Sequence, residues 1–105
     1  MPVVADPQAP VANSVPLRRI DEDEKCRILL ENTYGTYRVV YRRVKSVNQL
    51  VINNYIYDEV EFVIEPAHTL TAILDGHKFE VGYDGRNSSY FLVDGNEVEK
   101  KMRLV

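Results

Sequence analysis

The chain carries few side chains of the kinds that perform catalysis or ligate metals. Its 105 residues include two histidines, His68 and His77, and a single cysteine, Cys26. An imidazole can act as an acid, a base or a metal ligand, and a thiolate is a nucleophile. Cys26 has no second cysteine with which to form a disulfide, and it precedes the apolar run Ile28-Leu29-Leu30. This setting is typical of an inert, partly buried thiol and favours a reducing compartment.

The two histidines are placed too far apart to share a metal ion. His77 directly follows Asp75-Gly76, a dipeptide typical of tight hairpin turns. Counting outward from that turn pairs His77 with Leu74 and places His68 opposite Tyr83. The imidazoles are then about a strand length apart, and no third ligand has the spacing of a structural zinc site. We therefore expect no metal site.

Carboxylates and glycines give no stronger indication of catalysis. Glu59 and Glu61 recur at a period of two, as do Glu97 and Glu99, and this period places side chains on one face of a strand. Such pairs are typical of a solvated face, whereas glycoside hydrolysis needs two carboxylates across a cleft. The glycines match neither a phosphate-binding loop nor a dinucleotide fingerprint. We expect no catalytic residue and no cofactor.

The most informative functional pattern is a basic run with interleaved tyrosines over residues 37–45. Tyrosines on a strand can stack on nucleic-acid bases while neighbouring arginines neutralise phosphates. The alternative is a strand with one packed face and one solvated basic face, which pairs with an acidic strand over residues 58–65. The candidate binding residues are Tyr37, Arg38, Tyr41, Arg42, Arg43 and Lys45.

A second basic cluster lies near the C-terminus and comprises Lys100, Lys101 and Arg103. Charged side chains of this kind protect an edge strand from pairing with other chains. They also attract phosphate or anionic lipid. Both interpretations remain open at this point.

Strand-forming residues and hairpin turns dominate the chain from Lys25 onward. Asp-Gly occurs three times, at residues 75–76, 84–85 and 94–95, and Asn53-Asn54 marks a further tight turn. Lys100 interrupts the apolar stripe of the last strand, which indicates a sheet edge or a bulge. Strand-forming runs lie over residues 26–30, 36–47, 50–52, 55–57, 58–65, 69–74, 77–83, 88–93 and 96–104.

This pattern predicts an all-β fold. No window has the apolar period of a helix, and connections this short force antiparallel pairing. A single sheet of this size would leave its apolar face uncovered. We therefore expect seven to eight hairpin-connected strands in a β-sandwich or a small, partly open barrel.

The first residues differ in composition from the rest. Four of the five prolines lie within residues 1–16, and no aromatic residue precedes Tyr34. Residues 1–24 carry the whole net charge of −3, since residues 25–105 hold eleven acids and eleven bases. Such a composition buries too little apolar surface to offset ordering entropy. We predict a disordered tail over residues 1–22 and one antiparallel β domain over residues 23–105.

Several segments look familiar together: residues 50–59 and 66–72, Asp75-Gly76-His77, Ser89-Tyr90 and Val93-Asp94-Gly95. Over residues 48–105 they resemble small bacterial all-β domains, and that resemblance implies no particular activity. The hairpin rhythm around residues 76–80 and 93–97 is more faintly similar to the β-sandwich modules of the Fas apoptosis inhibitory molecule family. That second resemblance implies a non-enzymatic module, although this chain has no tryptophan.

These observations favour a non-catalytic module that binds a protein partner or self-associates through a sheet edge. A nucleic-acid or anionic-surface binder using residues 37–45 is the alternative, and the neutral charge of residues 25–105 argues against it. A third hypothesis is a small ligand bound in a sandwich cavity. No apolar run is long enough to cross a membrane, and we expect a cytoplasmic protein.

Overall fold

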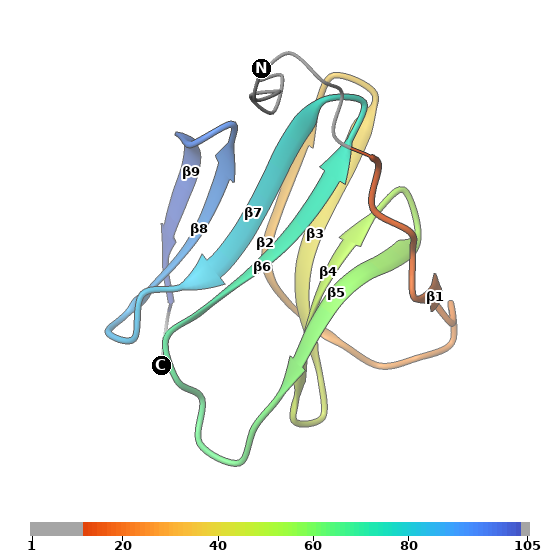
Figure 1. The fold of residues 1–105 in the computed structure, drawn as a ribbon. Helices are drawn as coiled ribbons and strands as arrows, with labels where there is room; N and C mark the ends of the chain where they lie inside the picture. The colour runs from red at the N-terminus through yellow and green to blue at the C-terminus, as the bar shows by residue number, and fades with distance from the viewer. Residues whose placement is uncertain (1–11, 104–105) are drawn as a thin grey trace, which may run out of the picture.

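The computed structural model describes residues 12–103, which form nine antiparallel strands and no helix (Figure 1). The first sheet has the strand order β1-β5-β4-β3-β2 and the second has the order β6-β7-β8-β9. Because the described residues form no helix, none of them forms a helix able to span a membrane. The strands are β1 (Arg18–Arg19), β2 (Arg27–Tyr34), β3 (Tyr37–Val44), β4 (Val47–Ile52), β5 (Tyr55–Glu61), β6 (His68–Leu74), β7 (His77–Tyr83), β8 (Ser88–Val93) and β9 (Asn96–Met102).

Two-residue turns set the register of the hairpins. Asp75 and Gly76, like Asp94 and Gly95, adopt the positive φ angles that a tight hairpin requires. Asn53 and Asn54 do the same at φ values of 49° and 71°. The predicted turns at these sites are confirmed, and His68 pairs with Tyr83 as expected. The third Asp-Gly pair lies in a longer connection between β7 and β8.

Several strand boundaries differ from the predicted ones. β2 continues to Tyr34 rather than ending at residue 30, and β4 begins at Val47 rather than at residue 50. The long strand expected over residues 36–47 ends at Val44, because Lys45 adopts a φ of 56° and turns the chain into β4. The segments 55–57 and 58–65 form one continuous strand, β5, which ends at Glu61. β9 is both an edge strand and bulged, with a register shift opposite Phe91 and Leu92.

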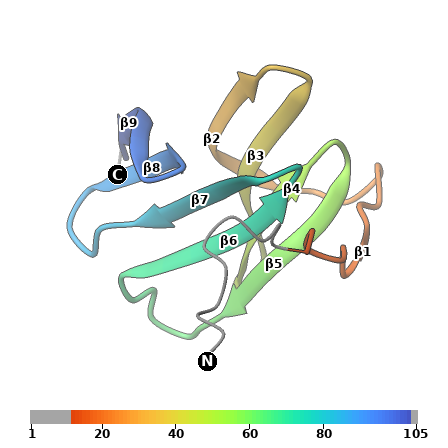
Figure 2. The ribbon, with the colours of Figure 1, turned by 45° about the horizontal axis from the view of Figure 1, so that its top comes forward.

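The two sheets pack face to face and bury one apolar core between them, which confirms the predicted sandwich. Inward-facing side chains alternate along the strands, as Val39 and Tyr41 do on β3 and Phe79 and Val81 do on β7. Contacts of β5 and β4 with β6, and of β2 with β8, hold the layers together. β9 lies beyond β8 at the outer margin in both views (Figures 1 and 2). Six of its seven residues are exposed, so the first sheet covers little of it and reaches it mainly through Asn32 of β2, which bonds to Glu99.

The N-terminal segment (residues 13–26) joins the sandwich earlier than predicted. Residues 1–11 of the expected tail lie outside the described residues. Arg18 and Arg19 form β1 against β5, which adds a ninth strand, and the amide of Leu17 donates to the carbonyl of Ile56 at 2.7 Å. Ile20 packs against an apolar cluster on the outer face of the first sheet, made of Val40, Val51 and Ile56. This outer cluster needs a cover, and the N-terminal segment supplies it.

The packing of β7 against β6 predicts a large effect of one small substitution. A Cβ atom added at Gly82 would lie 2.2 Å from the carbonyl oxygen of His68 and 2.5 Å from the hydroxyl of Tyr90. Gly82→Ala should therefore lower the free energy of unfolding by about 1–3 kcal/mol, measured by urea denaturation. The exposed control Lys78→Ala should change it by less than about 0.5 kcal/mol. Equal effects of the two substitutions would contradict this close approach.

Candidate functional site

The residues singled out in the sequence do not form one surface. Tyr37, Tyr41 and Arg43 lie on the inner face of β3 or at its end, where Tyr37 packs against the core. Arg38 and Arg42 belong to the outer face and pair with Glu31 and Glu24, respectively. Lys45 lies in the turn after β3. The alternation of side chains along a strand causes this separation, so the four bases do not share an exposed face.

The inner set belongs to a polar cluster at one end of the sandwich, centred on the hydroxyl of the buried Tyr41. Nδ1 of His68 lies 2.8 Å from the carbonyl oxygen of Pro66, which can only accept, so this nitrogen carries the proton. Nε2 of His68 therefore accepts from the Tyr41 hydroxyl at 2.6 Å. Nδ2 of Asn48 and Nη2 of Arg103 donate to the same hydroxyl at 3.0 and 3.2 Å. Tyr41 thus links β3, β4, β6 and the residue after β9.

Glu65 is the anionic member of the polar cluster. Its carboxylate accepts hydrogen bonds from Arg43 and Arg103 and from Nδ2 of Asn48 at 2.8 Å. Burial opposes ionisation, but the hydrogen bonds from Arg103 and Arg43 outweigh it and hold the pKa of Glu65 below its ordinary value. Burial also raises the pKa of Tyr41 to about 12, against the opposing effects of Asn48 and Arg103. Glu65 is therefore ionised, and Tyr41 neutral, at physiological pH.

The polar cluster leaves no buried atom unpaired. Within residues 12–103, no buried side-chain nitrogen or oxygen lacks a hydrogen-bond partner. The members of the cluster therefore hold one another in place, and no unpaired buried group marks a ligand site there. Sequence reasoning did not foresee it, since Glu65 lies in a connection and Arg103 lies 62 residues from Tyr41. Asn48, a polar residue at an inward position of β4, was the one available signal.

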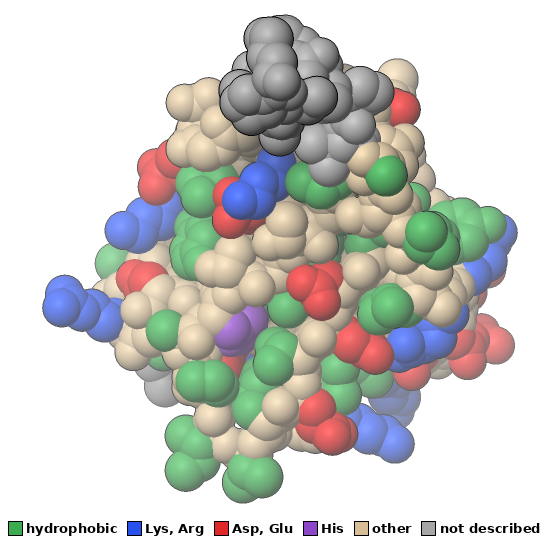
Figure 3. Space-filling model, viewed as in Figure 1, with side chains coloured by type: hydrophobic (Ala, Val, Ile, Leu, Met, Phe, Trp, Pro, Cys, Tyr) green, Lys and Arg blue, Asp and Glu red, His purple; other side chains and the backbone are tan. Residues whose placement is uncertain are grey.

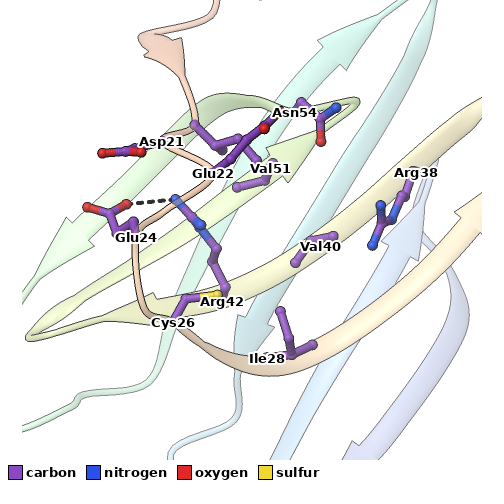
Figure 4. Close-up of a pocket in the computed structure, with 11 residues that line it drawn as sticks. Asp21, Glu22, Glu24, Cys26, Ile28, Arg38, Val40, Arg42, Val51 and Asn54 are labelled. Atoms are coloured by element: carbon purple, nitrogen blue, oxygen red, sulfur yellow. Dashed lines mark hydrogen bonds and ion pairs between the residues drawn. The ribbon is translucent and has the colours of Figure 1, made fainter.

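A pocket of about 200 Å³ lies on the outer face of the first sheet, between the N-terminal segment and β2 (Figure 4). Val40, Val51 and Ile28 give it an apolar floor. The guanidinium of Arg42, whose side chain is 5% exposed, donates to Glu24 at 3.1 Å and to Gln49 at 2.9 Å. Arg42 and Glu24 are thus paired with each other, and the pocket is also lined by the charged side chains of Asp21, Glu22 and Arg38.

Cys26 lies at the rim of this pocket (Figure 4) and is exposed, in contrast to the partly buried thiol expected. It precedes β2, where the chain crosses from the N-terminal segment to the sheet, and so misses the buried positions Leu29 and Leu30. His77 bonds to Asp94 at 2.7 Å, and this hydrogen bond lowers the pKa of Asp94. No group of three or more metal-ligating side chains occurs among the residues that the structure describes.

Charge is interspersed on the surface rather than gathered. On the face drawn in Figure 3, basic and acidic side chains alternate among polar ones. The most exposed apolar side chains are Val63 and Ile64 in the connection between β5 and β6, followed by Val15, Met102 and Leu17. Met102 belongs to β9, where Val98 is also exposed. β9 therefore combines exposed apolar side chains with an open strand edge.

No family model, curated protein or solved structure matches the chain. The geometry of these sites is therefore the basis for assigning a role.

The polar cluster predicts a pH-dependent stability. Glu65→Gln removes the charge that Arg43 and Arg103 share, and should lower the free energy of unfolding at pH 7 by about 2 kcal/mol. Because the folded pKa of Glu65 is depressed, its contribution is present above the unfolded value of about 4.3 and is lost as pH falls through the folded value. The difference in the free energy of unfolding between wild type and Glu65→Gln should therefore become smaller below about pH 4.

Urea denaturation at a series of pH values measures this difference. Glu61→Gln, an exposed carboxylate at the end of β5, serves as the control and should leave stability nearly unchanged. A gap between wild type and Glu65→Gln that stays constant from neutral to acid pH would contradict the role given to Glu65.

Proposed function

We propose that this domain is a non-catalytic protein-interaction module that binds an extended segment along the outer edge of β9. The observation that carries this proposal is the exposure of β9, a seven-residue strand with six exposed residues at the margin of the second sheet. An edge strand presents unpaired backbone groups that a further strand can join. Exposed Val98 and Met102 add apolar contact for a partner.

The other sheet edges of the described residues are less available. Side chains accept hydrogen bonds from two amides of β6 and one in the turn after it: Asp58 accepts from Thr71, Ser14 from Ile73 and Asn13 from Asp75, at 2.7–3.0 Å. β1 has two residues only. β2 is interrupted by the irregularity between Ile28 and Leu30, and the side chain of Asn32 caps the amide of Thr33 at 2.7 Å. β9 is thus the edge best able to accept a strand.

The direction of the backbone groups of β9 follows from one hydrogen bond. The amide of Arg103 donates to the carbonyl of Asn87 at 2.6 Å, toward β8. Hydrogen-bonded and non-hydrogen-bonded positions alternate in an antiparallel pair, so the backbone N–H and C=O groups of Lys101 also point toward β8. Lys100 and Met102 then direct their N–H and C=O groups away from the sheet.

β9 is also held in position before a partner arrives. Nδ2 of Asn32 on β2 donates to Glu99 at 2.8 Å, which fixes the middle of the strand. Nε of Arg103 donates to the hydroxyl of Ser89 at 2.8 Å, and its guanidinium lies 4.0 Å from the ring centroid of Tyr83. A preformed edge loses little conformational freedom on binding, which favours affinity.

The alternatives have less support. Nucleic-acid binding through residues 37–45 needs its bases together on one exposed face, whereas Arg38 and Arg42 are paired with acids on one face and Arg43 lies on the other. The volume of the outer-face pocket lies below the roughly 300–1,000 Å³ of typical small-molecule sites.

Selection of extended peptides from a random display library, followed by amide hydrogen exchange, tests this function. A bound peptide should slow exchange of the Lys100 and Met102 amides at least tenfold, because both become hydrogen-bonded to it. Lys100→Pro removes an outward N–H without removing a bond to β8, and should weaken binding at least tenfold.

Lys100→Ala is the matched control, since it keeps the N–H and should retain most of the binding. Peptides that protect Val63 and Ile64, or the outer-face pocket, while leaving Lys100 and Met102 unprotected would overturn the assignment of β9. Equal binding by the proline and alanine variants would do the same.

A further inference from the structure

Charge is divided unevenly along β9. The first half of the strand carries the acids Glu97 and Glu99, and the second half carries the bases Lys100 and Lys101. When a strand pairs antiparallel with β9, its C-terminal half lies beside the acidic N-terminal half of β9. The best-matched partner strand is therefore acidic first and basic second, which is the layout of β9 itself.

We propose that the partner of β9 is β9 of a second copy of this chain, paired antiparallel about a twofold axis. This inference rests on the proposed function of the β9 edge and names its occupant. The second sheet of each copy has four strands, so the pairing joins two such sheets into one continuous sheet of eight. An interface of this kind is self-complementary, as a twofold axis requires.

The register follows from the outward backbone groups. Pairing Lys100 with Lys100 of the second copy aligns two residues that both direct their N–H and C=O groups outward. Lys101 of each copy then lies opposite Glu99 of the other. Both side chains point to the inner side of the sheet, because their neighbours on β8 are the buried Ser89 and Phe91. Opposite charges across strands on one face contribute favourably.

The position of β9 leaves room for the second copy. The strand lies at the margin of the sandwich in Figures 1 and 2, and its principal packing neighbour is β8. An added strand therefore extends the second sheet outward without displacing the first. The two Lys100 side chains meet at the axis, and this like-charged pair makes the dimer weaker than the Lys101–Glu99 pairs alone would.

Sedimentation equilibrium of charge variants tests the second copy as partner. The basic variant Glu97→Lys/Glu99→Lys and the acidic variant Lys100→Glu/Lys101→Glu each place like charges across the axis. The dimer dissociation constant of each should rise at least tenfold. An equimolar mixture of the two should form a heterodimer at least as tight as the wild-type dimer, because the pairs at residues 99, 100 and 101 are then all of opposite sign.

Two further measurements control for loss of folding. The fourfold variant with both pairs exchanged (E97K, E99K, K100E, K101E) should again form a homodimer, since the polarity of the strand is only reversed. Raising the salt concentration should weaken the wild-type dimer, because exposed charge pairs are screened. A variant that merely unfolds would not regain association on mixing or on reversal.

A wild-type chain that stays monomeric to millimolar concentration would overturn this proposal, as would single-sign variants that dimerise like the wild type. These outcomes differ from a failure of the proposed function. If peptides still protect Lys100 and Met102 in a monomeric protein, β9 binds a different chain. If the protein dimerises but exchange at Lys100 and Met102 is unchanged, the dimer uses another surface and the second copy is not the partner of β9. The proposed function itself fails only if selected peptides also leave Lys100 and Met102 unprotected.

Discussion

Arg103 is the side chain on which the position of the outer edge depends. β9 extends past the first sheet, so apolar packing alone does not hold it. Arg103 follows its last residue and reaches back to Ser89, Glu65 and the hydroxyl of Tyr41, while it stacks on Tyr83. Its side chain is only 14% exposed. Burial of a guanidinium is costly unless it is paired, and Glu65 supplies the charge that offsets this cost. The polar cluster thus stabilises a strand that the core does not reach.

The N-terminal segment decides which edge remains open. Ser14 accepts from an amide of β6 and Asn13 from the amide of Asp75 in the following turn, while Ile20 and Glu24 cover the outer face of the first sheet. Without that cover, Val40 and Val51 would be exposed and Arg42 would lose its charged partner. The segment closes one side of the sandwich, and the side with β9 stays accessible. The N-terminal segment thus leaves β9 as the accessible edge of the sandwich.

Local turn chemistry made most of the fold predictable. Asp-Gly and Asn-Asn pairs adopt positive φ in the structure, and counting outward from them placed His68 opposite Tyr83 correctly. Contacts between distant residues were not predictable in this way. Arg43, Glu65 and Arg103 come together only because the end of β3, the connection from β5 to β6 and the residue after β9 meet at the same end of the sandwich. The interleaved tyrosines and arginines of β3 looked like one surface, yet the alternation of a strand divides them between two faces. The order of residues 13–22 was also missed, since composition does not reveal an outer apolar cluster that needs a cover.

Charge on an edge strand usually prevents association, and β9 has both lysines and a bulge that act in this way. The order of the charges along β9 also determines which partner strands it can accept. A uniformly basic edge would repel every copy of itself in any register. β9 instead has acids before its bases, so repulsion is relieved in an antiparallel alignment centred near Lys100. A shift of two residues in either direction brings Lys101 opposite Lys101 or Glu99 opposite Glu99. Electrostatic repulsion of an approaching strand is therefore weakest for a strand with the charge order of β9. Variants that exchange the acids and bases test whether the charges select a partner. Variants that only remove the charges would show no more than whether the charges prevent association.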